Sequence, residues 1–152
     1  MKSRALWGAA IASLLFMILN TKKTPLGIRN DNPLNIRTGT NWNGAIGENG
    51  GFIVFDSPLM GIRAGARVLR TYRDNYGIDN IHDIINRFAP PIENDTQSYI
   101  DHVSGVVGVG EFEPLTPEQY PLLIAAMIKH ENGQQPYDIA LINEGFALGF
   151  LA

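Results

Sequence analysis

Residues 116–133 read TPEQYPLLIAAMIKHENG and contain the clearest helix signal in the chain. Thr116 can cap a helix, a proline suits its first turn, and Gln119 can complete a capping box. Residues 122–128 are apolar nearly all round, which is typical of a helix buried inside a fold. Gly133 can then end the helix in a left-handed conformation. We therefore expect this helix to form the core.

Three further helices are predicted before this one. An apolar helical period begins after Asp56 or Ser57, either of which can cap it, with Pro58 in the first turn. Asn80 caps a second helix that stops before the proline pair at 90–91, and a third begins near residues 95–96 and runs until the glycines at 105, 108 and 110. The tail from 137 to 150 is expected to be short and partly helical.

The stretch from residue 27 to residue 55 is rich in asparagine and glycine, which favours turns and short strands. Residues 52–55 (FIVF) are predicted to form an edge strand. Together with the helices, this small β-hairpin region predicts an α+β fold that is mainly helical. The chain has 152 residues, of which 45% are hydrophobic and 18% charged, so we expect one folded domain and exclude a disordered chain.

The amino terminus carries a basic segment and then the uncharged residues 5–19 (ALWGAAIASLLFMIL), which are followed by Lys22 and Lys23. This pattern is typical of an uncleaved signal anchor, although it is shorter than the ~20 residues of a comfortable membrane span. We predict a membrane helix over residues 1–20, a linker over 21–28 and the folded domain over 29–152. Residues 5–19 would contact the lipid bilayer, with the amino terminus inside the cytoplasm and the domain outside it. The alternative is a buried core helix.

Charge is distributed unevenly along the chain. Residues 1–73 carry ten Lys or Arg and three Asp or Glu, whereas residues 74–152 carry two and twelve. The two halves of one domain can attract each other, and the alternative is a polyanionic partner. Arg63, Arg67 and Arg70 fall on one side of the predicted helix, where they are either solvated or bind a ligand.

Several kinds of catalytic site are disfavoured. There is no cysteine, the histidines at 82, 102 and 130 lack metal-ligand spacing, and no GxSxG motif is present. We therefore expect no metal and no cofactor. One carboxylate stands out, because Glu131 closes the most apolar helix, where the helix dipole and partial burial would raise its pKa. A carboxyl group that keeps its proton can protonate the leaving oxygen of a glycosidic bond; the alternative is an ordinary surface residue.

Four segments resemble motifs of the lysozyme superfamily, in particular its glucosaminidase-like and lytic-transglycosylase-like peptidoglycan hydrolases. They are residues 128–133 (IKHENG), which look like the end of the catalytic helix, and residues 32–37 (NPLNIR), 42–44 (WNG) and 52–58 (FIVFDSP). The resemblance covers residues 27–145 and implies a lysozyme-like helical domain. The catalytic helix comes last here and first in those enzymes, so a circularly permuted order is implied.

The resemblance implies that Glu131 is the catalytic general acid. A second carboxylate would then activate water, and Glu48, in the loop expected to face the cleft, is a better candidate than Asp56 or Glu93. Without such a partner, the hydroxyl of the sugar itself would close onto the anomeric carbon, as in lytic transglycosylases. The sequence leaves both reactions open.

Four further residues are candidates for contact with the glycan, because sugars present hydroxyl groups to amides and apolar faces to aromatic rings. They are Asn32, Asn35, Trp42 and Tyr99. The alternative for the two asparagines is loop construction, and the alternative for the two aromatic residues is packing in the core.

The resemblance therefore implies a peptidoglycan-degrading glycosidase of phage type, either a muramidase or a lytic transglycosylase. It would be tethered to the host inner membrane or to a virion membrane and act in host lysis or in virion entry. Its partner would be the glycan strand of peptidoglycan, and no nucleic acid is expected. The alternative is a non-enzymatic, membrane-anchored virion or envelope protein of the same fold that binds glycan or another protein.

Overall fold

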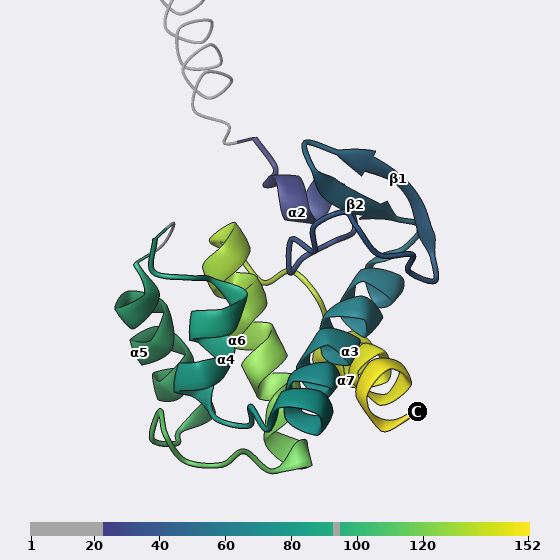
Figure 1. The fold of residues 1–152 in the computed structure, drawn as a ribbon. Helices are drawn as coiled ribbons and strands as arrows, with labels where there is room; N and C mark the ends of the chain where they lie inside the picture. The colour runs from purple at the N-terminus through teal and green to yellow at the C-terminus, as the bar shows by residue number, and fades with distance from the viewer. Residues whose placement is uncertain (1–22, 93–94) are drawn as a thin grey trace, which may run out of the picture.

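The computed structural model describes residues 23–92 and 95–152 (Figure 1). The elements in chain order are α2 (Leu26–Arg29), β1 (Ala45–Asn49), β2 (Phe52–Phe55), α3 (Pro58–Tyr76), α4 (Ile81–Phe88), α5 (Thr96–Val107), the 3₁₀ turn η1 (Pro117–Gln119), α6 (Tyr120–Asn132), α7 (Ile139–Phe146) and the π-helical turn η2 (Ala147–Leu151). Helices predominate, and β1 and β2 form an antiparallel hairpin. The predicted α+β class, mainly helical with a small β-hairpin, is confirmed.

Helix α6 packs against both α5 and α7 and lies in the middle of the helical part (Figure 1). Its start is set by local chemistry, because the Gln119 side chain accepts the Thr116 N–H at 2.9 Å and η1 forms the first turn. Gly133 ends the helix with a φ of 70°. Between these points Leu123, Ile124, Met127 and Ile128 have no exposed surface, whereas Leu122 is 42% exposed. The predicted core helix is confirmed, with a tighter 3₁₀ turn at its start.

The C-terminal segment packs along α3 at very short range. A Cβ at Gly149 would lie 2.2 Å from the Arg63 carbonyl oxygen, so a side chain there would prevent η2 from coming so close to α3. Phe146 and Phe150 are buried on the inner side of this segment. The tail that was expected to be partly helical is thus helical from residue 139 to residue 151 and completes the core.

Strand β2 is the more buried of the two strands in the small sheet. It pairs with β1 on one side, and on the other side the Ile53 N–H donates to the Ile36 carbonyl oxygen at 3.0 Å. The predicted strand over residues 52–55 is confirmed as one of the two strands of this sheet; the loop at Ile36 covers its outer side, whereas β1 is fully exposed. Ile53 and Phe55 face the core, so the alternation of the strand turns Phe52 to the opposite face.

Among the helices of residues 23–92 and 95–152, none combines the length and the hydropathy needed to cross a bilayer. The predicted anchor over residues 1–20, including the lipid contact of residues 5–19, lies outside the described residues and stays a prediction. Of the predicted linker over 21–28, residues 26–28 already belong to helix α2.

Candidate active site

The loop after α2 is built around Asn32, which has no exposed surface. Its Nδ2 donates to the carbonyl oxygens of Ile36 and Ile53, both at 2.9 Å, and its Oδ1 accepts the Ile36 N–H at 2.9 Å. The two bonds to Ile36 close the loop on itself, and the bond to Ile53 joins the loop to β2. A side chain without exposed surface cannot touch a sugar, so the loop-building interpretation replaces the predicted glycan contact of Asn32.

Asn35, three residues further on, directs its side chain out of the loop. Its backbone adopts a φ of 51°, a conformation that asparagine tolerates better than most residues, and its side chain turns towards the end of α6. There its Nδ2 donates to Oε2 of Glu131 at 3.1 Å. The contact joins residues that are 96 positions apart in the chain. Asn35 is thus placed directly at the candidate general acid.

Asn132 ties the same loop to α6. Its Nδ2 donates to the carbonyl oxygen of Pro33 at 2.8 Å and to that of Ile128 at 2.9 Å, and the residue is only 8% exposed. The bond to Pro33 bridges the helix and the loop two residues before Asn35. Asn132 therefore holds the loop at the distance from which Asn35 reaches Glu131.

The Glu131 carboxyl group lies in surroundings that favour its protonated form. Burial raises its pKa above the ordinary value for glutamate, while the Asn35 amide and, to a smaller extent, the Tyr99 hydroxyl counteract this by stabilising the carboxylate. The net direction is upward, as the sequence predicted. A carboxyl group whose proton is favoured by burial, and whose anion is stabilised by nearby donors, can release its proton during a reaction and take it back afterwards.

Tyr99 approaches Glu131 from α5. The residue is 1% exposed, and its ring stacks on that of His130 with 3.8 Å between the centroids. Burial first, and the nearby Glu131 charge second, raise the pKa of Tyr99 well above its usual value. Among the described residues, its hydroxyl has no partner in normal hydrogen-bond geometry, although it is near enough to Glu131 for each group to affect the other's pKa. Tyr99 is mainly a core residue whose polar tip faces the candidate acid.

A cleft of about 390 Å³ opens beside Glu131. This volume lies within the roughly 300–1,000 Å³ of typical small-molecule sites. Its walls come from the 34–37 loop, β2, α3, the end of α4 and the end of α6; the polar and aromatic residues among them are Asn35, Arg37, Phe52, Tyr72, Phe88 and Glu131. The Arg37 guanidinium lies 5.1 Å from the centre of the Phe52 ring. Within the described part of the chain, Glu131 is the one carboxylate that lines this cleft.

Sequence reasoning missed the aromatic wall of this cleft. Phe52 could have been found from the alternation of its strand, because it points away from the buried Ile53. Tyr72 and Phe88 follow the apolar helical spacing of α3 and α4, which predicts packing against the core rather than a place in a cleft. No local signal marks either residue as a cleft residue, since the cleft forms where three separate elements meet.

The predicted second carboxylate is not placed at this cleft. Glu48 lies on β1, whose five residues are all exposed, and it pairs in register with Ile53. It is not among the residues lining the cleft of Glu131, and Asp56, which is exposed and accepts a hydrogen bond from the Ser57 hydroxyl at 3.1 Å, is not either. Glu93 lies outside the described residues. The expected role of Glu48 in activating water is therefore not supported by its position.

Trp42 lines a second hollow, of about 370 Å³, with residues 38–41 and parts of both strands. The ring is half-buried and packs against the small cluster that contains Ile36 and Ile53. Trp42 is thus partly a packing residue and partly accessible. Since residues 34–37 line the first cleft and 38–42 the second, one continuous loop borders both.

The described residues contain no group of three His, Asp or Glu side chains that could hold a metal ion. No family model matches the sequence. A comparison with curated proteins finds Protein P5 of Pseudoalteromonas phage PM2, which is 45% identical over 130 residues, covering 82% of this chain and 81% of that protein. The chain belongs to the Protein P5 family. The predicted association with bacteriophages is confirmed at this level, and the P5 family shares most of the domain that carries the cleft.

Proposed function

We propose that this member of the P5 family is a peptidoglycan-degrading glycosidase with a lysozyme-like fold, in which Glu131 is the general acid. One observation carries the proposal: a half-buried carboxyl group with a raised pKa lines a cleft of about 390 Å³ at the end of the core helix. Cleavage of a glycosidic bond needs a proton on the leaving oxygen, and a carboxyl group that retains its proton can supply it.

The absence of a second carboxylate among the described cleft residues favours the lytic transglycosylase reaction over hydrolysis. Glu131 would give its proton to the glycosidic oxygen while the bond between that oxygen and the anomeric carbon breaks. The 6-hydroxyl of the same sugar would then attack the anomeric carbon and return its proton to the Glu131 carboxylate. The product would carry a 1,6-anhydro ring, and no water would be consumed.

The cleft walls suit a sugar polymer. Asn35 would hold the Glu131 carboxylate in place through its 3.1 Å hydrogen bond and lies where it can also meet a sugar hydroxyl. The rings of Phe52, Tyr72 and Phe88 offer apolar surfaces of the kind on which sugar faces pack. Trp42, in the neighbouring hollow, would contact a unit further along the strand. The proposed setting is a membrane-tethered protein acting in host lysis or in virion entry.

A zymogram with peptidoglycan embedded in the gel tests the assignment. The wild type should clear the gel, and Glu131→Gln should lose at least ~100-fold of the activity, which is the lower range for removing a general acid. Glu144→Gln, on the exposed side of α7, is a matched control and should clear like the wild type, as should Glu48→Gln.

Mass spectrometry of the released fragments separates the two reactions, because only the transglycosylase forms 1,6-anhydro ends. Reducing ends together with loss of activity in Glu48→Gln would replace the proposal by a hydrolase with two carboxylates. Clearing by Glu131→Gln would remove the assignment of the acid. A wild type that binds peptidoglycan without clearing it would leave the non-enzymatic alternative, a glycan-binding virion or envelope protein.

A further inference from the structure

The C-terminal helical segment buries an apolar inner side and, at η2, also exposes apolar side chains. Its inner side buries Ile142, Phe146 and Phe150 against the rest of the core. Its outer side exposes Leu148 to 41% and Leu151 to 63%. A helix that is apolar all round normally has apolar surroundings on every side. Among the described residues, nothing covers the exposed leucines of η2.

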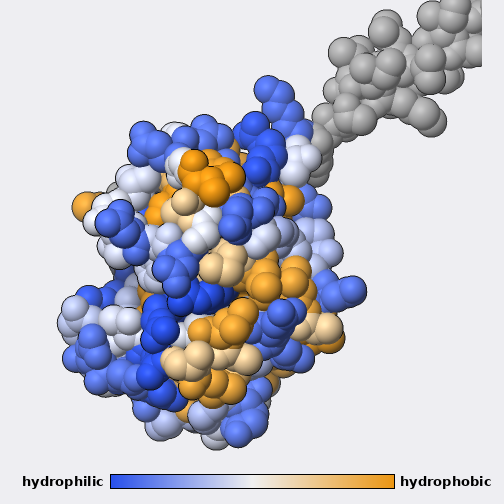
Figure 2. Space-filling view, turned by 90° about the vertical axis from the view of Figure 1, so that its right-hand side faces the viewer, coloured by the Kyte–Doolittle hydropathy of each residue, from blue (hydrophilic) through white to orange (hydrophobic). Residues whose placement is uncertain are grey.

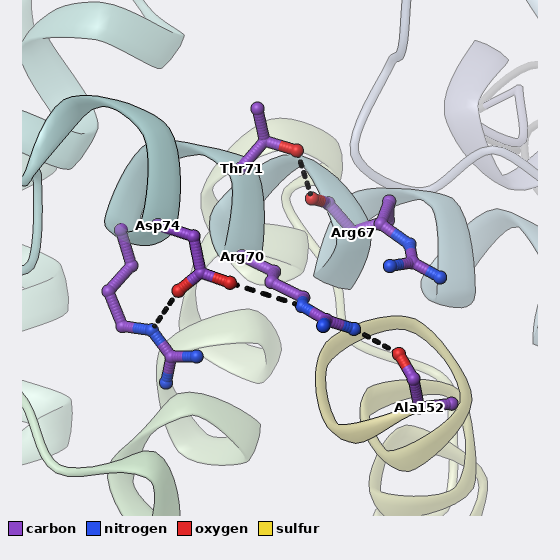
Figure 3. A network of polar contacts seen from close by, with 6 residues as sticks. Arg67, Arg70, Thr71, Asp74 and Ala152 are labelled. Atoms are coloured by element: carbon purple, nitrogen blue, oxygen red, sulfur yellow. Dashed lines mark hydrogen bonds and ion pairs between the residues drawn. The ribbon is translucent and has the colours of Figure 1, made fainter.

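Two arginines of α3, which form no ion pair with another described residue, have their backbone directly against this segment. Gly149 sits against the α3 backbone at Arg63 and Arg67, because a Cβ there would lie 2.2 Å from the Arg63 carbonyl oxygen and 3.0 Å from the Arg67 nitrogen. Arg70, one turn further on, binds Asp74 at 3.2 Å and also the carbonyl oxygen of Ala152. Figure 3 shows Arg70 between Asp74 and Ala152, together with the Arg67 carbonyl oxygen that accepts from the Thr71 hydroxyl; no dashed line reaches the Arg67 guanidinium from the residues drawn.

Across residues 23–92 and 95–152, neither Arg63 nor Arg67 forms a salt bridge. We define the basic–apolar face as Arg63, Arg67, Leu148 and Leu151. Figure 2 looks onto the side of the molecule where Figure 1 shows the C-terminal segment, and strongly hydrophilic and hydrophobic surface lie next to each other there.

We propose that the basic–apolar face docks onto the surface of an anionic lipid bilayer. Leucine side chains on the outer side of a helix can enter the boundary between headgroups and acyl chains, while arginines beside them reach anionic headgroups. A polybasic edge next to exposed apolar side chains is the usual composition of such interfacial surfaces. This inference goes beyond the proposed function and does not depend on Glu131.

Charge complementarity favours a bilayer over a second copy of this chain. A two-fold contact through this face would bring Arg63 and Arg67 of one copy towards the same residues of the other, with Glu144 as the one acidic residue within α7 and η2. Anionic headgroups instead supply the negative charge that both guanidinium groups lack. A bilayer can therefore bind the two arginines through its headgroups and the two leucines through its acyl chains.

Docking through this face would leave the cleft accessible. Tyr72 lines the cleft and comes nine residues after Arg63 on α3, which is about two and a half helical turns and places the two side chains on opposite sides of the helix. Helix α3 thus separates the proposed lipid surface from Glu131. A chain lying on a membrane by this face would keep its cleft open to a polymer.

The test uses the full chain, whose lack of cysteine makes single-cysteine labelling clean. Leu148→Cys and Leu151→Cys would each be labelled with an environment-sensitive fluorophore and reconstituted into vesicles of phosphatidylcholine and phosphatidylglycerol that contain a doxyl-lipid quencher. Val106→Cys is the matched control, because its 41% exposure equals that of Leu148 and its helix, α5, lies across the molecule from the C-terminal segment in Figure 1. The readout is local contact with lipid, so insertion of residues 1–20 does not by itself produce it.

We expect quenching at positions 148 and 151, none at position 106, and loss of the signal both in pure phosphatidylcholine vesicles and in the Arg63→Gln, Arg67→Gln double variant. No quenching at 148 and 151, or equal quenching at 106, would overturn the proposal. A fluorescence change that depends on protein concentration and not on the quencher would show a contact between copies instead. Because cleavage of peptidoglycan is measured separately, failure here and failure of the glycosidase assignment are distinguishable.

Discussion

Removing the Asn35 side chain should raise the pKa of Glu131 further. Asn35→Gly deletes the donor that lies 3.1 Å from Oε2 and keeps the backbone unstrained, because glycine accepts the φ of 51° at this position. A hydrogen bond to a charged group contributes about 1.5–3 kcal/mol, and the lower end applies to this partly buried pair. Since one pH unit corresponds to about 1.4 kcal/mol, the titration midpoint should move up by about one pH unit.

NMR of protein with ¹³C-labelled glutamate measures this midpoint directly, and the signal missing from Glu131→Gln assigns the residue. Asp31→Gly is the matched control: Asp31 is the other non-glycine residue with positive φ, at 50°, among the described residues, and it makes no hydrogen bond to Glu131. The basic limb of the activity profile should move with the midpoint, because the protonated acid is the active form. An unchanged or lower midpoint in Asn35→Gly would refute the electrostatic account of the site.

Three further outcomes concern stability, each measured by urea denaturation. Burial raises the pKa of Glu131 in the folded state, so protonation of this carboxyl group stabilises the fold. This stabilisation is fully present below the unfolded-state pKa and is lost as pH rises through the folded-state pKa. Glu131→Gln should therefore be more stable than the wild type at neutral pH, and the difference should vanish in acid. Asn132→Ala leaves two buried carbonyl groups without their donor and should cost about 3 kcal/mol, whereas the exposed control Asn143→Ala should stay within about 0.5 kcal/mol. Gly149→Ala sets a methyl group 2.2 Å from an α3 carbonyl oxygen and should cost more than about 2 kcal/mol, whereas Gly105→Ala, with open space around it in α5, should gain about 0.5–1 kcal/mol; equal effects would contradict the close packing of η2.

The helices were predictable because their signals are local. The capping box at Thr116, the apolar run after it and the left-handed glycine at 133 lie within one continuous stretch, and the structure keeps all three. The pKa direction of Glu131 followed from the same stretch, since a residue at the end of a buried helix is partly buried itself. These features need no knowledge of what packs against the helix.

The candidate site was predictable only in part. Asn32 and Asn35 are the same residue type three positions apart. The Asn32 side chain binds backbone groups of its own loop, whereas the Asn35 side chain binds Glu131. Glu48 was expected at the cleft because its Asn/Gly-rich loop was expected to face it, and the pairing of β1 with β2 turned it to the exposed edge instead. The choice in each case depends on a partner far away in the sequence.

The amino-acid sequence by itself determined the bounds of α4 and α5, the start of α3 and the end of α6, and it identified the buried helix and the carboxyl group that closes it. These features follow from caps, apolar periods and glycine stops, which act between neighbours in the chain; helix α2, which lacks such signals, was not predicted. Only the tertiary structure decided that Asn35 meets Glu131, that aromatic rings from β2, α3 and α4 wall the cleft, and that η2 packs against the α3 backbone at Arg63 and Arg67. These contacts join residues tens of positions apart, and their geometry is fixed by how whole elements pack rather than by any local preference.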